Sequence, residues 1–248
     1  MHRHVFGVKT IRSVLLLMTK RSTALKSEEQ SFVGSDEPEL SQVTRDMLHE
    51  QIYEMLKRNL MMGRFTPGQK LPLRGLAKSL GTSLMPVRDA LQRLESIGSV
   101  VSTPTRTMMV PLFTSKELAD IRTLRLVLES TALESAIRNG TDEEIETLKG
   151  YVDDIFRSAE ANNLDLFLVA NHHFHMHIAE MSRISFICQF LETLWMHLGP
   201  SVRRSVPNED LFHSSALNHK QVYDAILARD ILAANEALQK DISEGYNF

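Results

Sequence analysis

The sequence has one cysteine, Cys188, and no long hydrophobic run. A single thiol excludes an internal disulfide framework and a zinc finger built from cysteines, and it suits a reducing compartment, so we expect a cytoplasmic protein. A membrane-spanning helix needs about 18 apolar residues in succession. The nearest candidate, SVLLLM at 13–18, is too short, and no small-residue cleavage site follows it. We therefore expect neither a membrane span nor a secretory signal.

The chain also lacks internal repeats, low-complexity tracts and a recognisable nucleophile motif. What it does have is an uneven distribution of charge. Residues 41–112 carry 10 Lys and Arg against 5 Asp and Glu, whereas residues 113–248 carry 12 against 21. A small basic part joined to a larger acidic part predicts two domains, at 41–112 and 113–248, after a flexible N-terminal arm at 1–40. Only the basic domain suits a polyanion.

Within the basic domain, the pattern predicts a winged helix–turn–helix. Helical spacing covers 41–62, a Pro-Gly turn follows at 65–72, and short helices are expected at 74–80 and from Ser83, as the N-cap, to about 96. Two β-like runs, 99–103 and 106–110, then form a hairpin. In such folds the second short helix lies in the DNA major groove.

Three arginines occupy places suited to DNA contact. Arg88 lies one turn into the recognition helix, Arg74 opens the preceding helix, and Arg106 lies at the hairpin tip. Arginine can bind guanine or a phosphate through its two-pronged guanidinium group. Each could equally be a solvated surface charge, but the agreement of all three with one architecture favours double-stranded DNA as a partner.

The segment PGQKLPLRGLAKSLGTSLMPVRDALQRLESIG at 67–98 resembles the DNA-binding domain of the GntR family. By that resemblance Arg74, Ser83 and Arg88 fall on positions that contact DNA. Thr107 stands at the wing tip, where the family usually has glycine, and we add it to the expected DNA-binding residues. Leu84 stands where the family usually has a second arginine, so the operator sequence of relatives cannot be transferred.

From residue 115 onward the pattern predicts helices alone. Thr114 with Glu117, and Thr141 with Glu144, form capping boxes for helices to about 139 and 161. Further helices are expected at 163–182, 185–204, 214–228 and 230–244. The fold class is therefore mainly α, with an N-terminal winged helix–turn–helix followed by an all-α helical bundle.

Four histidines lie within the segment VANHHFHMHIAEM at 169–181. Residues four apart share a helix face, so Asn171 and His175 should point inward with the apolar side chains. His173 and His177 should then point outward. Trp195, Phe190 and Met196 are interpreted as core or as the wall of a cavity.

Two further polar residues are expected on apolar helix faces, His219 and Asp241. A buried carboxylate such as Asp241 needs a cation or hydrogen bonds. Asn171, His175, His219 and Asp241 could converge from three helices on one divalent ion. They could equally be hydrogen-bonded core residues, and the spacing alone leaves both alternatives open.

Residues 115–248 resemble the FCD domain, the FadR-type regulatory domain of GntR proteins. Many such domains bind a metal through an Asp-x-x-x-His pair and two later histidines. By this resemblance Asn171, His175, His219 and Asp241 form the ligand set, with Asn and Asp replacing two family residues. The resemblance implies zinc, nickel or manganese as the cofactor.

Arg125 and Glu129 are spaced as an i, i+4 pair, which on its own predicts a surface salt bridge. The family resemblance instead places them against an inner cavity, where Arg125 would bind the carboxylate of an effector.

The expected function is that of a bacterial transcription regulator, a repressor and homodimer, controlled by a small organic acid. Two alternatives remain at this stage. A metal-dependent enzyme acting on a small organic acid would need a general base beside the metal, and none is evident. An RNA or scaffold binder would need aromatic side chains on a sheet surface, and these are missing.

Overall fold

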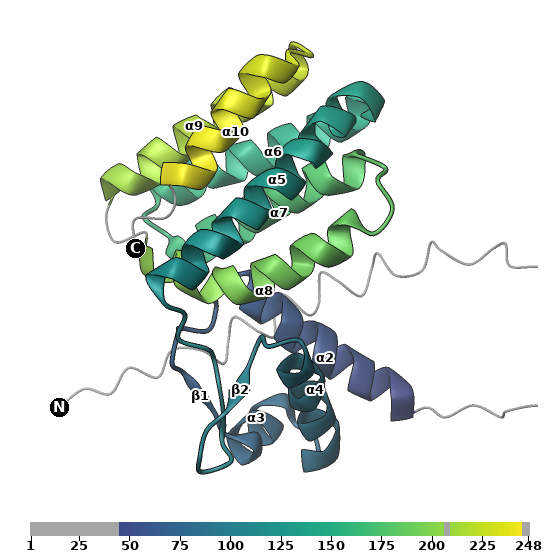
Figure 1. Cartoon of the computed structure of the whole chain (residues 1–248), viewed down its shortest axis with the longest axis vertical. Coiled ribbons are helices and arrows are strands. Elements are labelled where there is room, and N and C mark those ends of the chain that lie inside the picture. Colours follow the sequence, from purple (N-terminus) through teal and green to yellow (C-terminus); the bar gives the residue numbers. More distant parts are fainter. Residues whose placement is uncertain (1–44, 206–208, 245–248) are drawn as a thin grey trace, which may run out of the picture. The chain divides into compact units, whose positions relative to one another are not determined.

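The computed structural model describes residues 45–205 and 209–244, which lie within one compact unit, 43–248. The arm expected at 1–40 lies outside the described residues. The described part is mainly helical, as the sequence predicts (Figure 1). None of its helices combines the length and the apolar character needed to span a membrane.

The first part of the chain forms the expected winged helix–turn–helix. Its elements are α2 (Arg45–Met61), β1 (Lys70–Leu71), α3 (Leu73–Leu80), α4 (Leu84–Ser96), β2 (Val101–Ser102) and β3 (Met108–Met109). Gly81 ends α3 with a positive φ of 64°, and the next amide, that of Thr82, donates to the carbonyl of Ala77 at 3.0 Å. Glycine adopts this left-handed conformation without strain, so the chain turns sharply from α3 into α4.

The wing contains one strand more than the sequence predicts. β1 pairs antiparallel with β3, and β2 pairs with the other edge of β3, giving the order β1-β3-β2. We expected only a turn at 65–72, because two residues are too few to show the alternating pattern of a strand. At the hairpin tip the left-handed residue is Arg106, with φ 58°, and its amide donates to the carbonyl of Thr103.

The second part of the chain contains six helices in the described residues, and both expected capping boxes are present. The helices are α5 (Ser115–Asn139), α6 (Asp142–Glu160), α7 (Leu164–Met181), α8 (Ile187–Ser205), α9 (Glu209–Leu227) and α10 (Ile231–Glu244). α9 begins five residues before the expected position. α5 packs against α7, α8 and α10, and α6 packs against α7 and α9.

The helix α8 belongs to both parts of the molecule. It packs against α5 and α7 on one side and against α2 on the other. At Gly199 the approach of α2 is so close that a Cβ atom would lie 2.3 Å from the carbonyl oxygen of Leu60. An ion pair of 3.1 Å between Lys57 and Glu192 also joins the two helices. A shift in the position of α8 would therefore act directly on α2, the first helix of the winged helix–turn–helix.

Candidate DNA-binding surface and buried charged cluster

The helix α4 separates an apolar face from an exposed polar face. Val87, Ala90, Leu91 and Leu94 are buried, as the sequence predicts, and hold α4 against α2 and α3. Arg88 is exposed on the opposite side. Ser83 stands at the N-cap position, as the sequence predicts, but its side chain forms no capping hydrogen bond. Its exposed hydroxyl group is not committed to the helix end.

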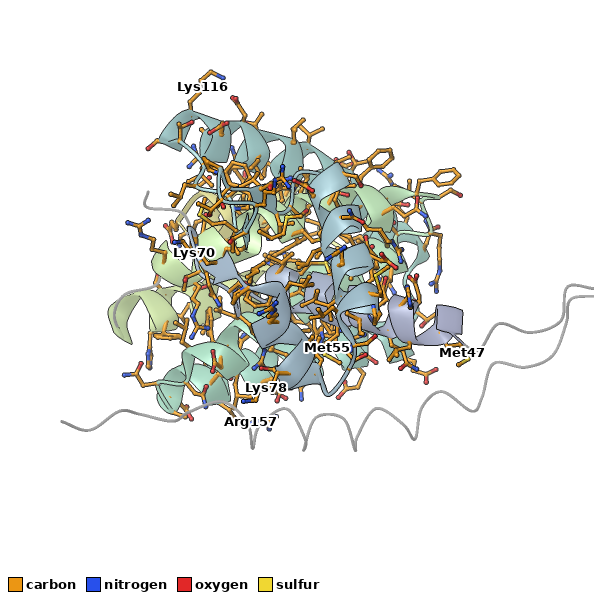
Figure 2. The ribbon with its side chains drawn as sticks, turned by 90° about the horizontal axis from the view of Figure 1, so that it is seen from below. Met47, Met55, Lys70, Lys78, Lys116 and Arg157 are labelled. Carbon is orange, nitrogen blue, oxygen red and sulfur yellow. The ribbon has the colours of Figure 1, made fainter. Side chains whose placement is uncertain are left out.

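Exposed basic residues continue beyond α4 onto α3 and the wing. Arg74 on α3 is exposed. Lys78 on α3 and Lys70 on β1 are exposed as well (Figure 2). Arg106 is exposed at the wing tip. Thr107 is only partly exposed, and its backbone amide donates to the side-chain hydroxyl of Thr103 at 3.1 Å. The three arginines expected to contact DNA, Arg74, Arg88 and Arg106, are thus all exposed, as contact with a phosphate or a base would require.

The second arginine of α4, Arg93, contacts α2 within the domain. Arg93 donates to the carboxylate of Glu50 on α2, and its guanidinium lies 3.6 Å from the ring centroid of Tyr53. Nearby, Asp89 lies 2.9 Å from His49. These pairs attach α4 to α2. Arg88, in contrast, has no ion pair within 45–205 and 209–244, and stays available to an external anion.

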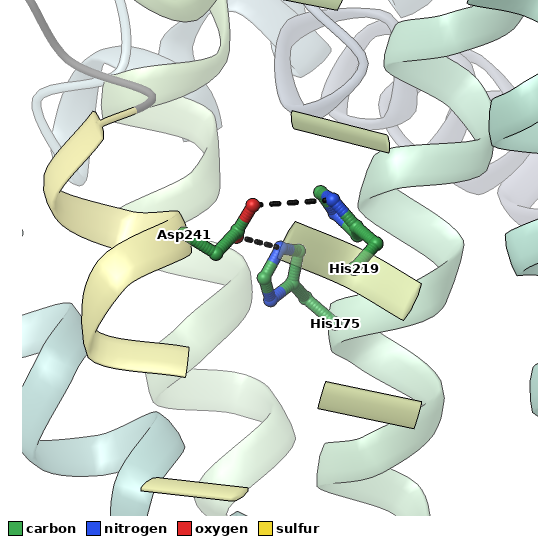
Figure 3. Close-up of side chains that lie close together, drawn as sticks. All are labelled: His175, His219 and Asp241. Carbon is green, nitrogen blue, oxygen red and sulfur yellow. Dashed lines mark ion pairs between the residues drawn. The ribbon is translucent and has the colours of Figure 1, made fainter. Parts of the chain in front are cut away.

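The second site is a buried cluster that combines three helices (Figure 3). Asp241 of α10 lies between two histidines: one carboxylate oxygen is 3.3 Å from Nε2 of His175 on α7, and the other is 3.1 Å from Nδ1 of His219 on α9. One ligand atom from each residue lies within 4.8 Å of those from the other two. The carboxylate on an apolar helix face thus has the partners that its burial requires.

The hydrogen bonds of His219 indicate its tautomer. Its Nδ1 lies 2.7 Å from the carbonyl oxygen of Ser215, and a carbonyl only accepts, so Nδ1 carries the proton. Nε2 then presents a lone pair, and it is buried without a hydrogen-bond partner in the described structure. Burial lowers the pKa of His219, which keeps the ring neutral. A neutral imidazole with a free lone pair is the form that binds metals.

A second ion pair adjoins the three-helix cluster. Glu129 lies 2.8 Å from Nδ1 of His175 and accepts from the guanidinium of Arg125. Arg125 and Glu129 are only 2% and 3% exposed, so the surface salt bridge predicted from spacing alone is wrong. Arg125 also lies 4.0 Å from the ring of Trp195. We define the buried cluster as Arg125, Glu129, His175, Trp195, His219 and Asp241.

The pKa shifts show that the buried cluster keeps its carboxylates ionised and favours the protonated form of His175. Burial would lower the pKa of His175, but the carboxylates of Glu129 and Asp241 outweigh burial and raise it. Burial likewise opposes ionisation of Glu129, yet the charges of Arg125 and His175 lower its pKa to about 2. With both histidines neutral, Arg125 and the two carboxylates sum to one negative charge. A proton or a metal ion would balance that charge.

Asn171 and His175 are buried, as the sequence predicts, but no hydrogen bond within residues 45–205 and 209–244 joins Asn171 to the other three expected ligands. A further histidine that was not expected in the site, His172, is buried beside Trp195 with ring centroids 5.3 Å apart, and neither of its nitrogens has a hydrogen-bond partner in the described part of the chain. The spacing of His172 and His175, at i, i+3, was the available signal. Burial lowers the pKa of His172 to about 3.

Two other expectations about orientation are wrong. His173 and His177 do not simply face solvent, because both rings lie 5.6 Å from that of Tyr151 on α6. The helix α6 packs against this side of α7 and shields it from solvent. Phe190 is not core, since it is exposed at the start of α8, whereas Trp195 and Met196 are buried as expected.

A winged helix–turn–helix with an exposed recognition helix, followed by a helical bundle with a buried charged cluster, defines a DNA-binding regulator. The comparisons with known proteins agree with this class. Residues 48–110 match the model of bacterial regulatory proteins of the gntR family, and residues 120–244 match the FCD domain. The chain belongs to the GntR family of transcription regulators, in the group that carries an FCD domain.

Individual relatives lead to the same assignment. The HTH-type transcriptional regulator McbR of Escherichia coli K12 is 30% identical over 152 residues, 61% of this chain and 69% of that protein. The HTH-type transcriptional repressor GlaR of the same organism is 25% identical over 198 residues, 77% of this chain and 90% of that protein. The solved structure of E. coli McbR/YncC has a TM-score of 0.75 at 26% identity, covering 79% of this chain and 94% of that one. These relatives are regulators and not enzymes, which removes the enzyme alternative.

Proposed function

We propose that this regulator is a repressor whose affinity for its operator is controlled by a small carboxylate bound at the buried cluster. The observation that carries the proposal is the cluster itself. Charged and metal-ligating side chains from four helices, α5, α7, α9 and α10, meet in the interior of the helical part, where stability alone would favour apolar packing. Burying charged groups at a cost in stability is typical of a functional site.

The donor set fits a divalent metal ion. His175, His219 and Asp241 would hold the ion, and Asn171, one turn before His175, would add an amide oxygen. The orphaned Nε2 of His219 supports this assignment, as does the negative balance of the cluster. A mixed nitrogen and oxygen set is compatible with zinc, nickel or manganese. Such an ion, when bound, supplies a positive centre for an oxygen of the effector.

Arg125 is positioned to complete the recognition of a carboxylate. Glu129 and the ring of Trp195 hold its guanidinium in one orientation, so little side-chain entropy remains to be lost on binding. An anionic effector would add negative charge beside Arg125, and we expect the protonated form of His175 or a metal ion to accompany it. The effector class is therefore a small organic acid.

Control of DNA binding would pass through α8. Trp195, the member of the buried cluster on α8, contacts Arg125, and the same helix packs against α2 around Gly199. α2 in turn holds the recognition helix through Arg93 and Glu50. An effector changes DNA affinity only by its differential affinity for two states of the protein. We propose that those states differ in the position of α8 against α2.

Binding of a near-palindromic operator requires two copies of the chain, and we propose a homodimer. α5 and α8 lie side by side (Figure 1), and both leave large apolar side chains exposed. These are Leu124 and Val127 on α5, with Phe186 and Phe190 around the start of α8. Exposed apolar side chains on adjacent elements favour a protein interface. Val127→Glu should therefore yield a monomer, whereas Leu232→Glu, at an exposed position of α10, should not.

Native mass spectrometry of the purified full-length chain tests these proposals together. We expect a dimer mass with one divalent ion per chain, and any co-purified acid would add a further mass. Elemental analysis identifies the ion. Asp241→Asn and His219→Ala should lose the ion, while His213→Ala, an exposed histidine on the same helix as His219, should keep it. An ion that survives both cluster substitutions would contradict the assignment of the site.

A further inference from the structure

The first turn of α4 exposes two large apolar side chains. Leu84 is 40% exposed and Met85 is 56% exposed, although five other residues of α4, Pro86 among them, are buried. Arg88 lies one helical turn after Leu84, so these side chains share one region of the helix surface. We call Leu84, Met85 and Arg88 the reading surface. Apolar side chains with this exposure contribute little to the stability of the fold. We therefore ask which binding partner they would contact.

The position of the reading surface on the recognition helix indicates which part of the DNA it would contact. In a winged helix–turn–helix the N-terminal residues of the recognition helix face the base edges in the major groove. Leu84 and Met85 are the first two residues of that helix. The major groove offers one apolar group, the 5-methyl of thymine, while guanine presents two hydrogen-bond acceptors that leucine and methionine cannot satisfy.

We propose that Leu84 and Met85 read thymine through its 5-methyl group, so that each operator half-site carries an A·T pair opposite this turn. The inference deepens the DNA-binding function and rests on it. Arg88 supplies the charged contact of the same surface, to guanine or to a phosphate. Methionine has an unbranched, adaptable side chain, so Met85 tolerates small shifts in the position of the methyl group.

The charge around the reading surface favours DNA over a protein partner. Lys70, Arg74, Lys78 and Arg106 are all exposed on the same winged-helix part. Arg93, the other arginine of α4, is held by Glu50, which leaves Arg88 as the cation beside the two apolar side chains. Basic residues flanking a narrow apolar contact suit a polyanion that also presents methyl groups.

The test uses operator DNA obtained by selection with the full-length protein from a random duplex library. Each thymine of the selected site is then replaced by uracil, which removes the 5-methyl group and nothing else. We expect one or two positions in each half-site at which uracil weakens binding about fourfold, the effect of one buried methyl group. Fluorescence anisotropy with labelled duplexes measures the affinity.

The matching protein variants are Leu84→Ala and Met85→Ala. Both side chains are exposed, so the fold should survive, and circular dichroism checks this. Each variant should bind the thymine operator more weakly and lose its sensitivity to uracil at its own position. Leu84→Arg should shift the selected base there toward guanine. Sensitivity to uracil that persists in both alanine variants, or selected half-sites without such a thymine, would overturn the thymine reading alone. Failure to select any DNA would overturn the DNA-binding function as well.

Discussion

The reading surface of α4 and the buried cluster both contain charged side chains, but those of the first are exposed and those of the second are buried and paired. Arg88 is exposed to solvent and has no ion pair in the described residues. Leu84 and Met85, in the first turn of α4, are exposed as well. In the cluster, Arg125 is enclosed by Glu129 and Trp195, and Asp241 is enclosed by two histidines. The exposed site meets a partner that brings the opposite charge, whereas the charges of the buried site are paired mainly with one another and leave one negative charge for a proton or a metal ion. Substitutions should therefore affect binding at the first site and stability at the second.

The largest effect is expected where the buried ion pair between Arg125 and Glu129 is broken. Glu129→Gln leaves the charge of Arg125 buried without its carboxylate, and should lower the free energy of unfolding by about 3–5 kcal/mol. Asp120→Asn removes the same charge from an exposed i, i+4 pair with Lys116 and should leave the free energy of unfolding nearly unchanged, because water screens that pair. Urea denaturation measures both. Equal losses would show that burial does not distinguish the two pairs.

The exposed site should show the reverse pattern. If Arg88 contacts DNA as we propose, Arg88→Ala should weaken binding of the selected operator by about 1–3 kcal/mol. It should leave the unfolding free energy unchanged, because the side chain is exposed and does not pack in the core. Arg157→Ala removes the same charge from an exposed position on α6 and serves as the control. Anisotropy titrations at one fixed salt concentration compare the two variants. Equal affinity of Arg88→Ala and the wild type would exclude Arg88 from the interface.

The contact between α2 and α8 joins the two regions, and its tightness can be tested at one atom. Gly199→Ala would place a Cβ 2.3 Å from the carbonyl oxygen of Leu60, and should destabilise the protein by about 1–3 kcal/mol. At Gly150, within α6, a Cβ meets nothing within 4 Å. Gly150→Ala should stabilise the helix by about 0.5–1 kcal/mol. Thermal unfolding separates the two outcomes by sign, and a neutral Gly199→Ala would contradict the close contact.

The last expected effect is a change in how the free energy of unfolding depends on pH. The pKa of His172 falls from 6.5 in the unfolded chain to about 3 in the fold. Between these values the unfolded chain binds a proton that the folded chain does not. This contribution to stability is therefore complete above pH 6.5 and is lost as the pH falls toward 3, at up to about 1.4 kcal/mol per pH unit.

The variant His172→Asn isolates that contribution. Its unfolding free energy should change less steeply between pH 7 and pH 5 than that of the wild type, whatever its absolute stability. His213→Asn, at an exposed position of α9, should keep the wild-type slope. The measurement is urea denaturation across the pH series. Parallel curves for His172→Asn and the wild type would show that His172 is not buried in its neutral form.

Sequence patterns predicted the local features of this protein well. The capping boxes at Thr114 and Thr141 depend on residues three apart, and the buried face of α4 follows from helical spacing, so both could be read directly. The two-residue strand β1 could not, because it exists only through its pairing with β3.

The buried cluster shows the same limit of local patterns. The inward orientation of His175 and His219 followed from helical spacing, and Asp241 was expected to need a partner. The approach of Glu129 to His175 was not expected, because it depends on how α5 packs against α7. The placement of His172 beside Trp195 likewise depends on α8. Contacts between helices set the chemistry of this site, and a single helix does not reveal them.

The central claim is that the buried cluster and the DNA-binding surface are linked through α8. Trp195 is the one tryptophan of the chain and lies on that helix against Arg125, so its fluorescence reports on the cluster. The direct measurement is Trp195 emission during titration with the selected operator, with anisotropy of the labelled DNA recorded in parallel. The account predicts that Trp195 emission changes in step with DNA binding, although Trp195 is buried and lies outside the reading surface. DNA binding that reaches saturation while Trp195 emission stays constant would contradict it.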